Sequence, residues 1–113
     1  MLFGSKKDKI AAMAAKGKQT PKLCEYCFDK DPEIRIAAAT AVGKTKGDAG
    51  YNALVNLLRD EEVTVQIAAA KALGAMGSKN AMEHLRYMGN HTDNEELKAA
   101  CHASMAILNT KHD

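Results

Sequence analysis

The sequence predicts an all-α protein in which about three and a half helical hairpins, roughly seven helices, stack into a solenoid. Composition is the first observation: 20 of the 113 residues are alanine, and aromatic residues make up only 4%. Alanine is the best helix former, whereas strands favour β-branched and aromatic side chains. The second observation is an internal repeat, because the segment from Ile34 to Gly43 recurs 31 residues later as Val65 to Gly74. This length is typical of a single domain.

The repeated segment has the spacing of a helix with two apolar stripes. The copies IRIAAATAVG and VQIAAAKALG place apolar residues at positions i, i+3, i+4 and i+7. A weaker third copy starts at Leu97, where Cys101, His102 and Ser104 replace alanines and Ala106 replaces the glycine. One stripe is expected to face the hairpin partner and the other the next repeat. The small residues let these helices come close.

Capping residues and glycines set the expected helix boundaries. In chain order, the candidate starts are Ser5, Thr20-Pro21, Asp31-Pro32, Asp60, Ser78 and Asp93 with Glu96. Glycines at 17, 47 and 77 stand where a first helix should end. The seven expected helices cover residues 5–16, 20–28, 32–45, 48–58, 61–76, 79–89 and 94–109. Their short connections predict antiparallel hairpins.

Second apolar segments follow the repeated one and complete the hairpins. They run from Ala53 to Leu58 and from His84 to Gly89, and a shift of 31 residues finds a counterpart from Lys22 to Cys27. We therefore expect one domain over residues 1–113. Its expected parts are a degenerate N-terminal repeat at 1–28, repeats at 29–59 and 60–92, and a C-terminal half repeat at 93–113.

This pattern resembles the short HEAT-like repeats of the phycobilisome-lyase type. Their consensus is an acidic residue, then V-R-x-x-A-A-x-A-L-G, a short turn and A-x-x-x-L-x-x-x-L. The resemblance spans about residues 29–108 and is carried by Asp31 to Gly43, Ala53 to Asp60 and Val65 to Gly74. It implies a HEAT-repeat, armadillo-like α-solenoid and no particular function. Only Arg35 keeps the consensus arginine, with Gln66 and Lys98 in its place elsewhere, so we expect a weak ladder of arginine–aspartate pairs between repeats.

No catalytic constellation stands out among the reactive residue types. The sequence has no Gly-rich phosphate loop, no G-x-S-x-G motif and no paired catalytic carboxylates. Its acidic residues gather at expected helix starts, where capping explains them. We therefore expect a chain that is not an enzyme and that binds no cofactor and no metal ion.

Three cysteines come nearest to a reactive motif. Cys24-Glu-Tyr-Cys27 is a C-x-x-C pair, but no strand precedes it and no second pair completes a zinc site. Both cysteines align with apolar positions of the next repeat, and apolar filling is the simpler interpretation. Cys101-His102 is a candidate ligand pair, although we expect both on a polar outer stripe of the terminal helix. The four histidines, His84, His91, His102 and His112, show no ligand spacing. A redox or ligand role for Cys24, Cys27 or Cys101 stays open.

Charge is unevenly spread along the chain. Residues 1–22 hold six lysines against one aspartate, whereas the remainder is net acidic. No arginine or aromatic cluster accompanies these lysines, so they predict a solvated helix surface rather than a nucleic acid-binding patch. Free thiols and the lack of a signal-peptide pattern at the start predict a soluble cytoplasmic protein. No apolar run is long enough to span a membrane.

A protein or peptide partner is expected on the second helices, which usually line the concave side of stacked hairpins. Their inward residues should be Leu23, Tyr26, Leu54, Leu57, Leu85 and Met88. The other faces supply the candidate partner-binding residues Tyr51, Asn52, Val55, Arg59, Met82, Arg86 and Tyr87. Tyrosine and arginine are the types that anchor interfaces. Alternatively the tyrosine rings fill gaps between repeats, an interpretation that weighs more for Tyr87 than for Tyr51.

The main functional prediction is a non-enzymatic protein- or peptide-binding scaffold or adaptor. The resemblance raises an alternative, an accessory subunit of a cofactor-handling enzyme such as a bilin lyase, with Cys24 or Cys101 touching the ligand. Contact with phosphate or nucleic acid through the N-terminal lysines is a third hypothesis. At the C-terminal end, partly uncovered Met105, Ile107 and Leu108 would favour a homodimer. Alternatively, that helix packs back on helix 79–89.

Overall fold

The computed structural model describes residues 4–110, which contain seven α-helices, two short 3-10 turns and no strand. In chain order these are α1 (Lys6–Ala15), α2 (Pro21–Glu25), η1 (Tyr26–Phe28), α3 (Pro32–Val42), α4 (Asp48–Leu57), α5 (Val63–Met76), η2 (Lys79–Ala81), α6 (Met82–His91) and α7 (Glu95–Asn109). Each of the seven expected helices is present. The predicted second helix is split into α2 and η1, and the predicted sixth into η2 and α6.

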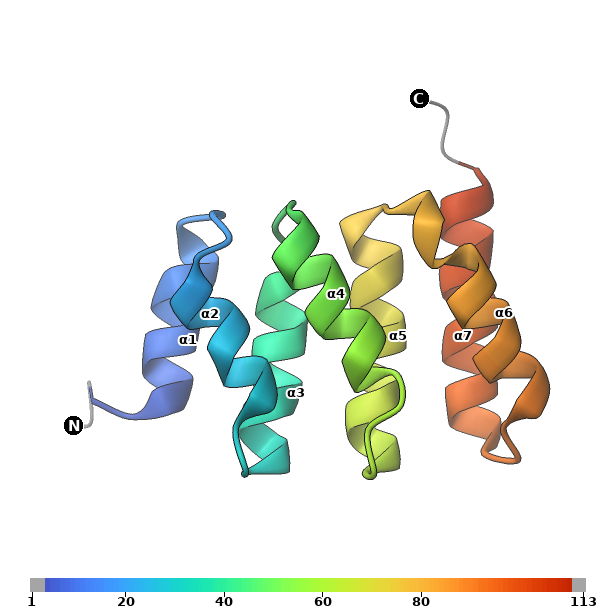
Figure 1. Cartoon of the computed structure of the whole chain (residues 1–113), viewed down its shortest axis with the longest axis horizontal. Helices are drawn as coiled ribbons and strands as arrows, with labels where there is room; N and C mark the ends of the chain where they lie inside the picture. The colour runs from blue at the N-terminus through green and yellow to red at the C-terminus, as the bar shows by residue number, and fades with distance from the viewer. Residues whose placement is uncertain (1–3, 111–113) are drawn as a thin grey trace.

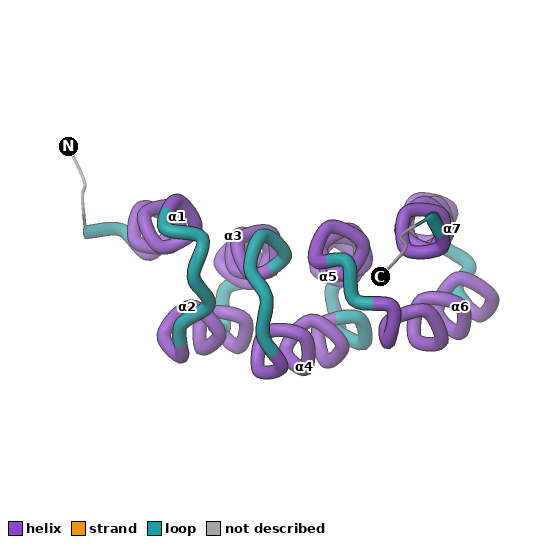
Figure 2. The backbone as a smooth tube through the Cα atoms, turned by 90° about the horizontal axis from the view of Figure 1, so that it is seen from above, coloured by secondary structure: helices purple, strands orange, loops and turns teal. Residues whose placement is uncertain are grey.

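The helices form two layers. Figure 1 shows the hairpins side by side, and Figure 2 shows α1, α3, α5 and α7 in one layer with α2, α4 and α6 in the other. We call the outer surfaces of these layers the first-helix face and the second-helix face. The molecule measures 42 × 33 × 20 Å. Because 20 Å is about two helix diameters, the stack is a slab two helices thick. The predicted all-α solenoid is confirmed.

The predicted repeat boundaries fall in turns between hairpins. The first lies between η1 and α3, the second between α4 and α5, and the third between α6 and α7. Each first helix contacts the first helix of the next repeat, in the pairs α1–α3, α3–α5 and α5–α7, which is the contact pattern of a solenoid.

Three of the predicted N-caps are confirmed. Each side-chain oxygen accepts a hydrogen bond from a backbone N–H of the first turn: Ser5 from Asp8, Thr20 from Leu23, and Asp31 from Glu33. These bonds satisfy donors that a helix start leaves without an intrahelical partner.

Other predicted boundaries are wrong. Asn94 caps α7 in place of Asp93, because its Oδ1 accepts from Leu97 N at 2.9 Å. Gly47 does not end α3 but precedes α4, with a φ of 152°. The helix α3 already ends at Val42, whose carbonyl oxygen accepts the Thr45 hydroxyl proton. Ser78 precedes η2 without a side-chain capping bond.

Two glycines let neighbouring first helices touch. A Cβ on Gly43 would lie 2.8 Å from Ala72 Cβ, and a Cβ on Gly74 would lie 2.7 Å from Ser104 Cβ. Real Cβ contacts are longer than 3.0 Å, so either side chain would push two helices apart. The glycine that ends both copies of the repeated segment is therefore required by the α3–α5 and α5–α7 contacts.

Leucines fill the space between the layers. Leu23, Leu54, Leu57 and Leu85 are almost completely buried, as predicted, and Tyr26 is buried beside them. Met88 is half-buried and packs against this core. The second helices therefore face the first-helix layer with their leucine stripe.

The terminal helix differs from expectation. Cys101 and Ser104 point into the core, and Ser104 Oγ donates to the Ala70 carbonyl oxygen at 2.7 Å. Of the Cys101-His102 pair, only His102 is exposed, so the predicted polar outer stripe is wrong for Cys101. The reason is that α7 packs on both α5 and α6, which covers two of its sides.

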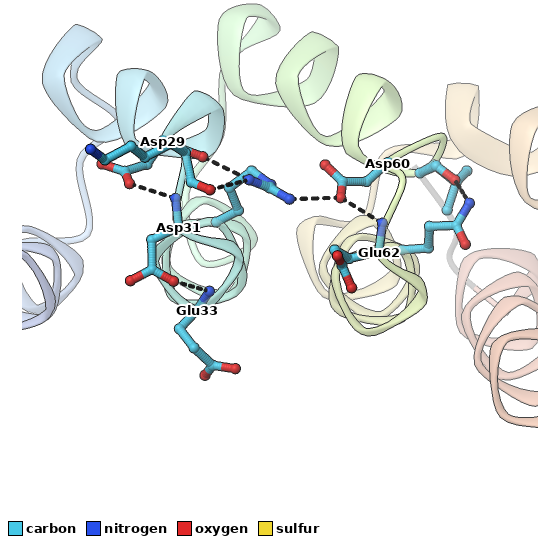
Figure 3. Close-up of polar contacts among 9 residues, drawn as sticks. Asp29, Asp31, Glu33, Asp60 and Glu62 are labelled. Atoms are coloured by element: carbon cyan, nitrogen blue, oxygen red, sulfur yellow. Dashed lines mark hydrogen bonds and ion pairs between the residues drawn. The ribbon is translucent and has the colours of Figure 1, made fainter.

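Polar side chains in the turns between hairpins join successive repeats (Figure 3). Arg35 Nη2 lies 3.0 Å from Asp60 Oδ2, and Nη1 donates to the carbonyl oxygens of Asp29 and Lys30. Asp29 is the counterpart of Asp60 in the preceding repeat and pairs with Lys6 Nζ at 2.7 Å. The arginine–aspartate pair between repeats, expected to be weak, is fully formed at this step.

The ladder stops at the next hairpin. Gln66 takes the arginine position and donates to the Leu58 carbonyl oxygen at 3.0 Å. Thr92 takes the position of Asp60 in this repeat. Its Oγ1 accepts a hydrogen bond from Asn94 N, just as Asp60 Oδ2 accepts one from Glu62 N. Threonine carries no charge, so only this hydrogen bond within the turn is kept and the ion pair is absent. The expectation of a weak ladder is therefore correct for this step.

Candidate partner-binding face

All seven predicted binding residues lie on α4, in the turn after it or on α6, but in separate places. Val55, Arg59 and Tyr87 line one hollow between α4 and α6, which we call the α4–α6 hollow. Tyr51 borders a second hollow near the turn after α5, while Met82 and Arg86 border a third that opens toward α7. Asn52 is exposed on α4. Only the first three are therefore brought together.

The α4–α6 hollow has an apolar interior and a polar rim. Its volume is about 100 Å³, and it is completed by Leu58, Glu83, His84 and Met88. It lies between α4 and α6, which pack on each other less closely than α5 and α7 do. An apolar cavity of roughly 150 Å³ accepts a benzene-sized group, so this hollow has room for one aliphatic side chain.

Tyr87 stands at the edge of this hollow with 58% of its surface exposed. Its ring stacks on that of His91, with centroids 3.9 Å apart, one helical turn along α6. Tyr51 is half-buried and packs against the core, and this burial raises the pKa of its hydroxyl. The gap-filling role weighed chiefly for Tyr87 thus fits Tyr51, and the exposed ring is Tyr87.

The two arginines of the predicted site differ in their partners. Arg86 pairs with Glu83 on its own helix. Arg59 is exposed and forms no ion pair within residues 4–110. Arg59 is therefore the cation at this hollow that is ready for an acidic group.

A second inter-repeat hollow lies on the other side of the C-terminal end of α4. This α2–α4 hollow has a volume of about 470 Å³ and is lined by Cys27, Phe28, Asp29, Lys30, Arg35, Asn56, Leu57, Asp60 and Glu61. Phe28 is 60% exposed, the largest exposed fraction among the large apolar side chains of residues 4–110. Sequence reasoning left it out of the site, although an aromatic residue at the end of a second helix, in a chain with few aromatic residues, was the available signal.

The residues considered for a homodimer are not equally uncovered. Leu108 is fully buried and Met105 half-buried, whereas Ile107 is 47% exposed. The alternative that α7 packs back on helix 79–89 is the one observed, because α7 contacts α6. The expected exposure of Leu108 is wrong.

The thiols are poorly suited to reactive chemistry. Burial raises the pKa of Cys27 to about 12 and that of Cys101 to about 11, and it raises the pKa of Cys24 as well. All three are free cysteines and protonated at neutral pH. Within residues 4–110, no three His, Cys, Asp or Glu side chains are grouped as metal ligands; His112 lies outside these residues. The bilin-lyase alternative therefore gains no support from Cys24 or Cys101.

Three N-terminal lysines already pair with carboxylates of the same chain. Lys6 contacts Asp29, Lys7 lies 3.9 Å from Glu33, and Lys22 lies 3.6 Å from Glu25. This arrangement is that of a solvated helix surface with local ion pairs.

Comparison with known proteins agrees with this geometry. No helix in the described part of the chain is long and apolar enough to cross a membrane.

A comparison with curated proteins gave no match. A sequence profile for HEAT repeats matches residues 20–106, well over half of the chain. The phycobilisome-lyase subtype stays a prediction, but the two-layer stack and this match establish the family: the chain belongs to the HEAT-repeat proteins.

Proposed function

We propose that this chain is a non-enzymatic scaffold that binds a protein or peptide across its second-helix face. One observation carries the proposal: the hollows on both sides of the C-terminal end of α4 each have an exposed aromatic ring beside them, Phe28 and Tyr87. HEAT repeats generally mediate protein–protein contacts, which supports the same function. Exposed aromatic residues beside hollows are typical of interface anchors.

The lining of the α4–α6 hollow suggests the chemistry of the partner. Val55, Leu58 and Met88 provide apolar contacts, and Arg59 supplies a cation at the rim. A segment with one aliphatic side chain next to a carboxylate would satisfy both. The α2–α4 hollow, whose charged lining is mostly paired within the chain, would take a larger polar stretch of the same segment.

Site-specific photo-crosslinking in the native cell tests this proposal. A benzophenone amino acid replaces Tyr87 in one variant, Phe28 in a second, and Ala12, an exposed α1 residue, in a matched control. We expect the same protein to crosslink from Tyr87 and Phe28 and not from Ala12. Calorimetry with the purified partner then measures the affinity. Crosslinking that is equal at Ala12, or absent from both aromatic positions, would reject the second-helix face.

Several expectations from the sequence accompany this proposal. We propose the division into repeats at 1–28, 29–59, 60–92 and 93–113, and we place the protein in the cytoplasm, where its free thiols would stay reduced. A homodimer would rest on Ile107, the exposed apolar residue of α7. Sedimentation of wild-type protein and Ile107→Lys tests it: one monomeric species for both would exclude a dimer, and a dimer lost only in the variant would support it.

A further inference from the structure

The first-helix face carries an apolar groove that the proposed second-helix site does not use. The groove runs between α3 and α5 and has a volume of about 400 Å³. Its lining residues are Ile36, Thr40, Lys44, Thr64, Ile67, Ala68, Lys71, Ala72 and Ala75. Ligand-binding clefts commonly measure roughly 300–1,000 Å³, so this groove is large enough for a specific contact.

The groove is formed by positions that follow helical spacing on both walls. Thr64, Ala68, Lys71 and Ala75 are separated by four, three and four residues along α5, which places them on one stripe. Ile36, Thr40 and Lys44 form the facing stripe along α3 and the turn after it. The bottom of the groove lies at Ala72, where Gly43 lets α3 come close to α5.

The charge of the groove has one sign. Its lining contains Lys44 and Lys71 and no acidic side chain. Both lysines are exposed, and neither forms an ion pair within residues 4–110. They therefore differ from Lys6, Lys7 and Lys22, which carboxylates of the same chain already pair. An apolar groove with two unpaired cations is complementary to an apolar stripe flanked by carboxylates.

The type of backbone that fits follows from the lining. The walls are two helices whose backbone groups bond within the helices, so the groove offers no edge to an extended segment. An extended peptide would leave its own N–H and C=O groups without partners against this apolar surface, whereas a helix satisfies them internally. We propose that the α3–α5 groove binds an acidic amphipathic helix of a partner protein, with its apolar stripe between Ile36 and Ala75 and its carboxylates on Lys44 and Lys71.

The test uses the full chain and a synthetic probe. The probe is a fluorescein-labelled, helix-stapled peptide with leucine and alanine at i, i+3, i+4 and i+7 and glutamates on both flanks. There are two control peptides. The first has the same composition in scrambled order, and the second has lysines in place of the glutamates. Fluorescence anisotropy measures the dissociation constants, and amide NMR shifts locate the peptide. We expect the acidic peptide alone to bind, with shifts confined to α3 and α5.

Charge reversal separates the groove from general attraction. The double variant Lys44→Glu/Lys71→Glu should bind the acidic peptide about tenfold more weakly. The variant Lys16→Glu/Lys18→Glu changes the net charge equally on exposed residues outside the groove and should bind as wild type does. Ala75→Arg would obstruct the groove and should abolish binding, while its unchanged circular dichroism would show an intact fold.

Other outcomes would overturn the proposal. Equal affinity for the scrambled or lysine-flanked peptide, or equal loss in both charge variants, would reject a specific acidic helix. Competition by single-stranded DNA or by anionic lipid vesicles would point to a phosphate-bearing occupant instead. NMR shifts on α4 and α6 would place the peptide on the second-helix face. The two proposals therefore fail separately, because each face has its own variants and its own shifts.

Discussion

The guanidinium group of Arg35 on α3 lies 3.0 Å from the carboxylate of Asp60 in the turn before α5, and both side chains are about nine-tenths buried. The same guanidinium donates to two backbone carbonyl oxygens, while Asp60 also accepts from Glu62 N. One ion pair thus fixes a hairpin to the helix that follows it. Its hydrogen bonds offset part of the cost of burying two charges, while the buried Arg35 Nε has no hydrogen-bond partner among the described residues.

Breaking this pair should destabilise the fold strongly. Asp60→Asn leaves the Arg35 charge buried without its partner, and we expect a loss of about 3 kcal/mol in the free energy of unfolding. Urea denaturation followed by circular dichroism measures it. Asp93→Asn, at an exposed position without a capping bond in the structure, is the matched control and should change stability little. Similar losses in both variants would contradict a special role for the pair.

The close approach of first helices predicts an effect opposite to helix propensity. Gly43→Ala and Gly74→Ala should each destabilise by about 1–3 kcal/mol, because the new Cβ meets Ala72 or Ser104. On propensity alone, alanine would stabilise a helix. Thermal unfolding distinguishes the two effects, and Gly4→Ala, which meets nothing within 4 Å, is the control. An unchanged melting temperature for both variants would show that the helices can separate without cost.

The Lys6–Asp29 pair predicts a shift that NMR can measure. The hydrogen bond from Lys6 lowers the pKa of Asp29, with further help from the Asp31 backbone N–H. A lowered folded-state pKa contributes stability above the unfolded value of 3.8, which is lost as pH falls through the folded-state value. Lys6→Ala should therefore raise the pKa of Asp29 toward 3.8, as followed by its side-chain carbon shift. No change would show that the pair does not persist in solution.

The buried thiol of Cys27 predicts a loss of stability at high pH. Desolvation raises its pKa from 9.0 to about 12, so the folded state favours the protonated form. The stability it contributes is complete below pH 9.0 and declines as pH rises toward 12. Cys27→Val removes the titrating group. Above pH 9.0 the unfolding free energy of the wild type should therefore fall relative to that of the variant. A constant difference across this range would contradict the assignment.

The second-helix face predicts binding defects without unfolding. Tyr87→Ala and Arg59→Ala should each reduce the free energy of binding to the crosslinked partner by about 1–3 kcal/mol, since both residues lie at the α4–α6 hollow. Calorimetry measures the affinity, and urea denaturation should show little change because both residues are exposed. The double variant Tyr51→Ala/Arg86→Ala serves as a comparison from neighbouring hollows. Binding that survives in every one of these variants would place the partner elsewhere.

The repeated segments made most of the fold predictable. The alanine and glycine positions of the two copies led to the first-helix layer, and the leucine spacing led to the second. Helix ends were less predictable because local bonds decide them: Asn94 accepts the capping bond that was predicted for Asp93. The inward turn of Cys101 depended on how α7 packs against two helices, which no local pattern records.

The candidate site was only partly predictable. Assigning residues to the second helices correctly placed Val55, Arg59 and Tyr87 on one face, but which of them share a hollow depends on the distance between α4 and α6. Phe28 was undervalued because the choice among the outward residues favoured tyrosine and arginine, the types that most often anchor interfaces, although Phe28 is equally exposed. The α3–α5 groove was missed since Ala68 and Ala72 were both interpreted as close-packed residues, whereas Ala68 is only half-buried and lines the groove.

The 20 Å thickness of the slab has a consequence for assembly. The groove between α3 and α5 and the hollow between α4 and α6 open on opposite sides, with one layer of leucines between them. Two macromolecules docked there would not collide, and neither would need the other to leave. The chain would then act as a spacer between two proteins in a ternary complex, and its two helix layers would fix the distance between them.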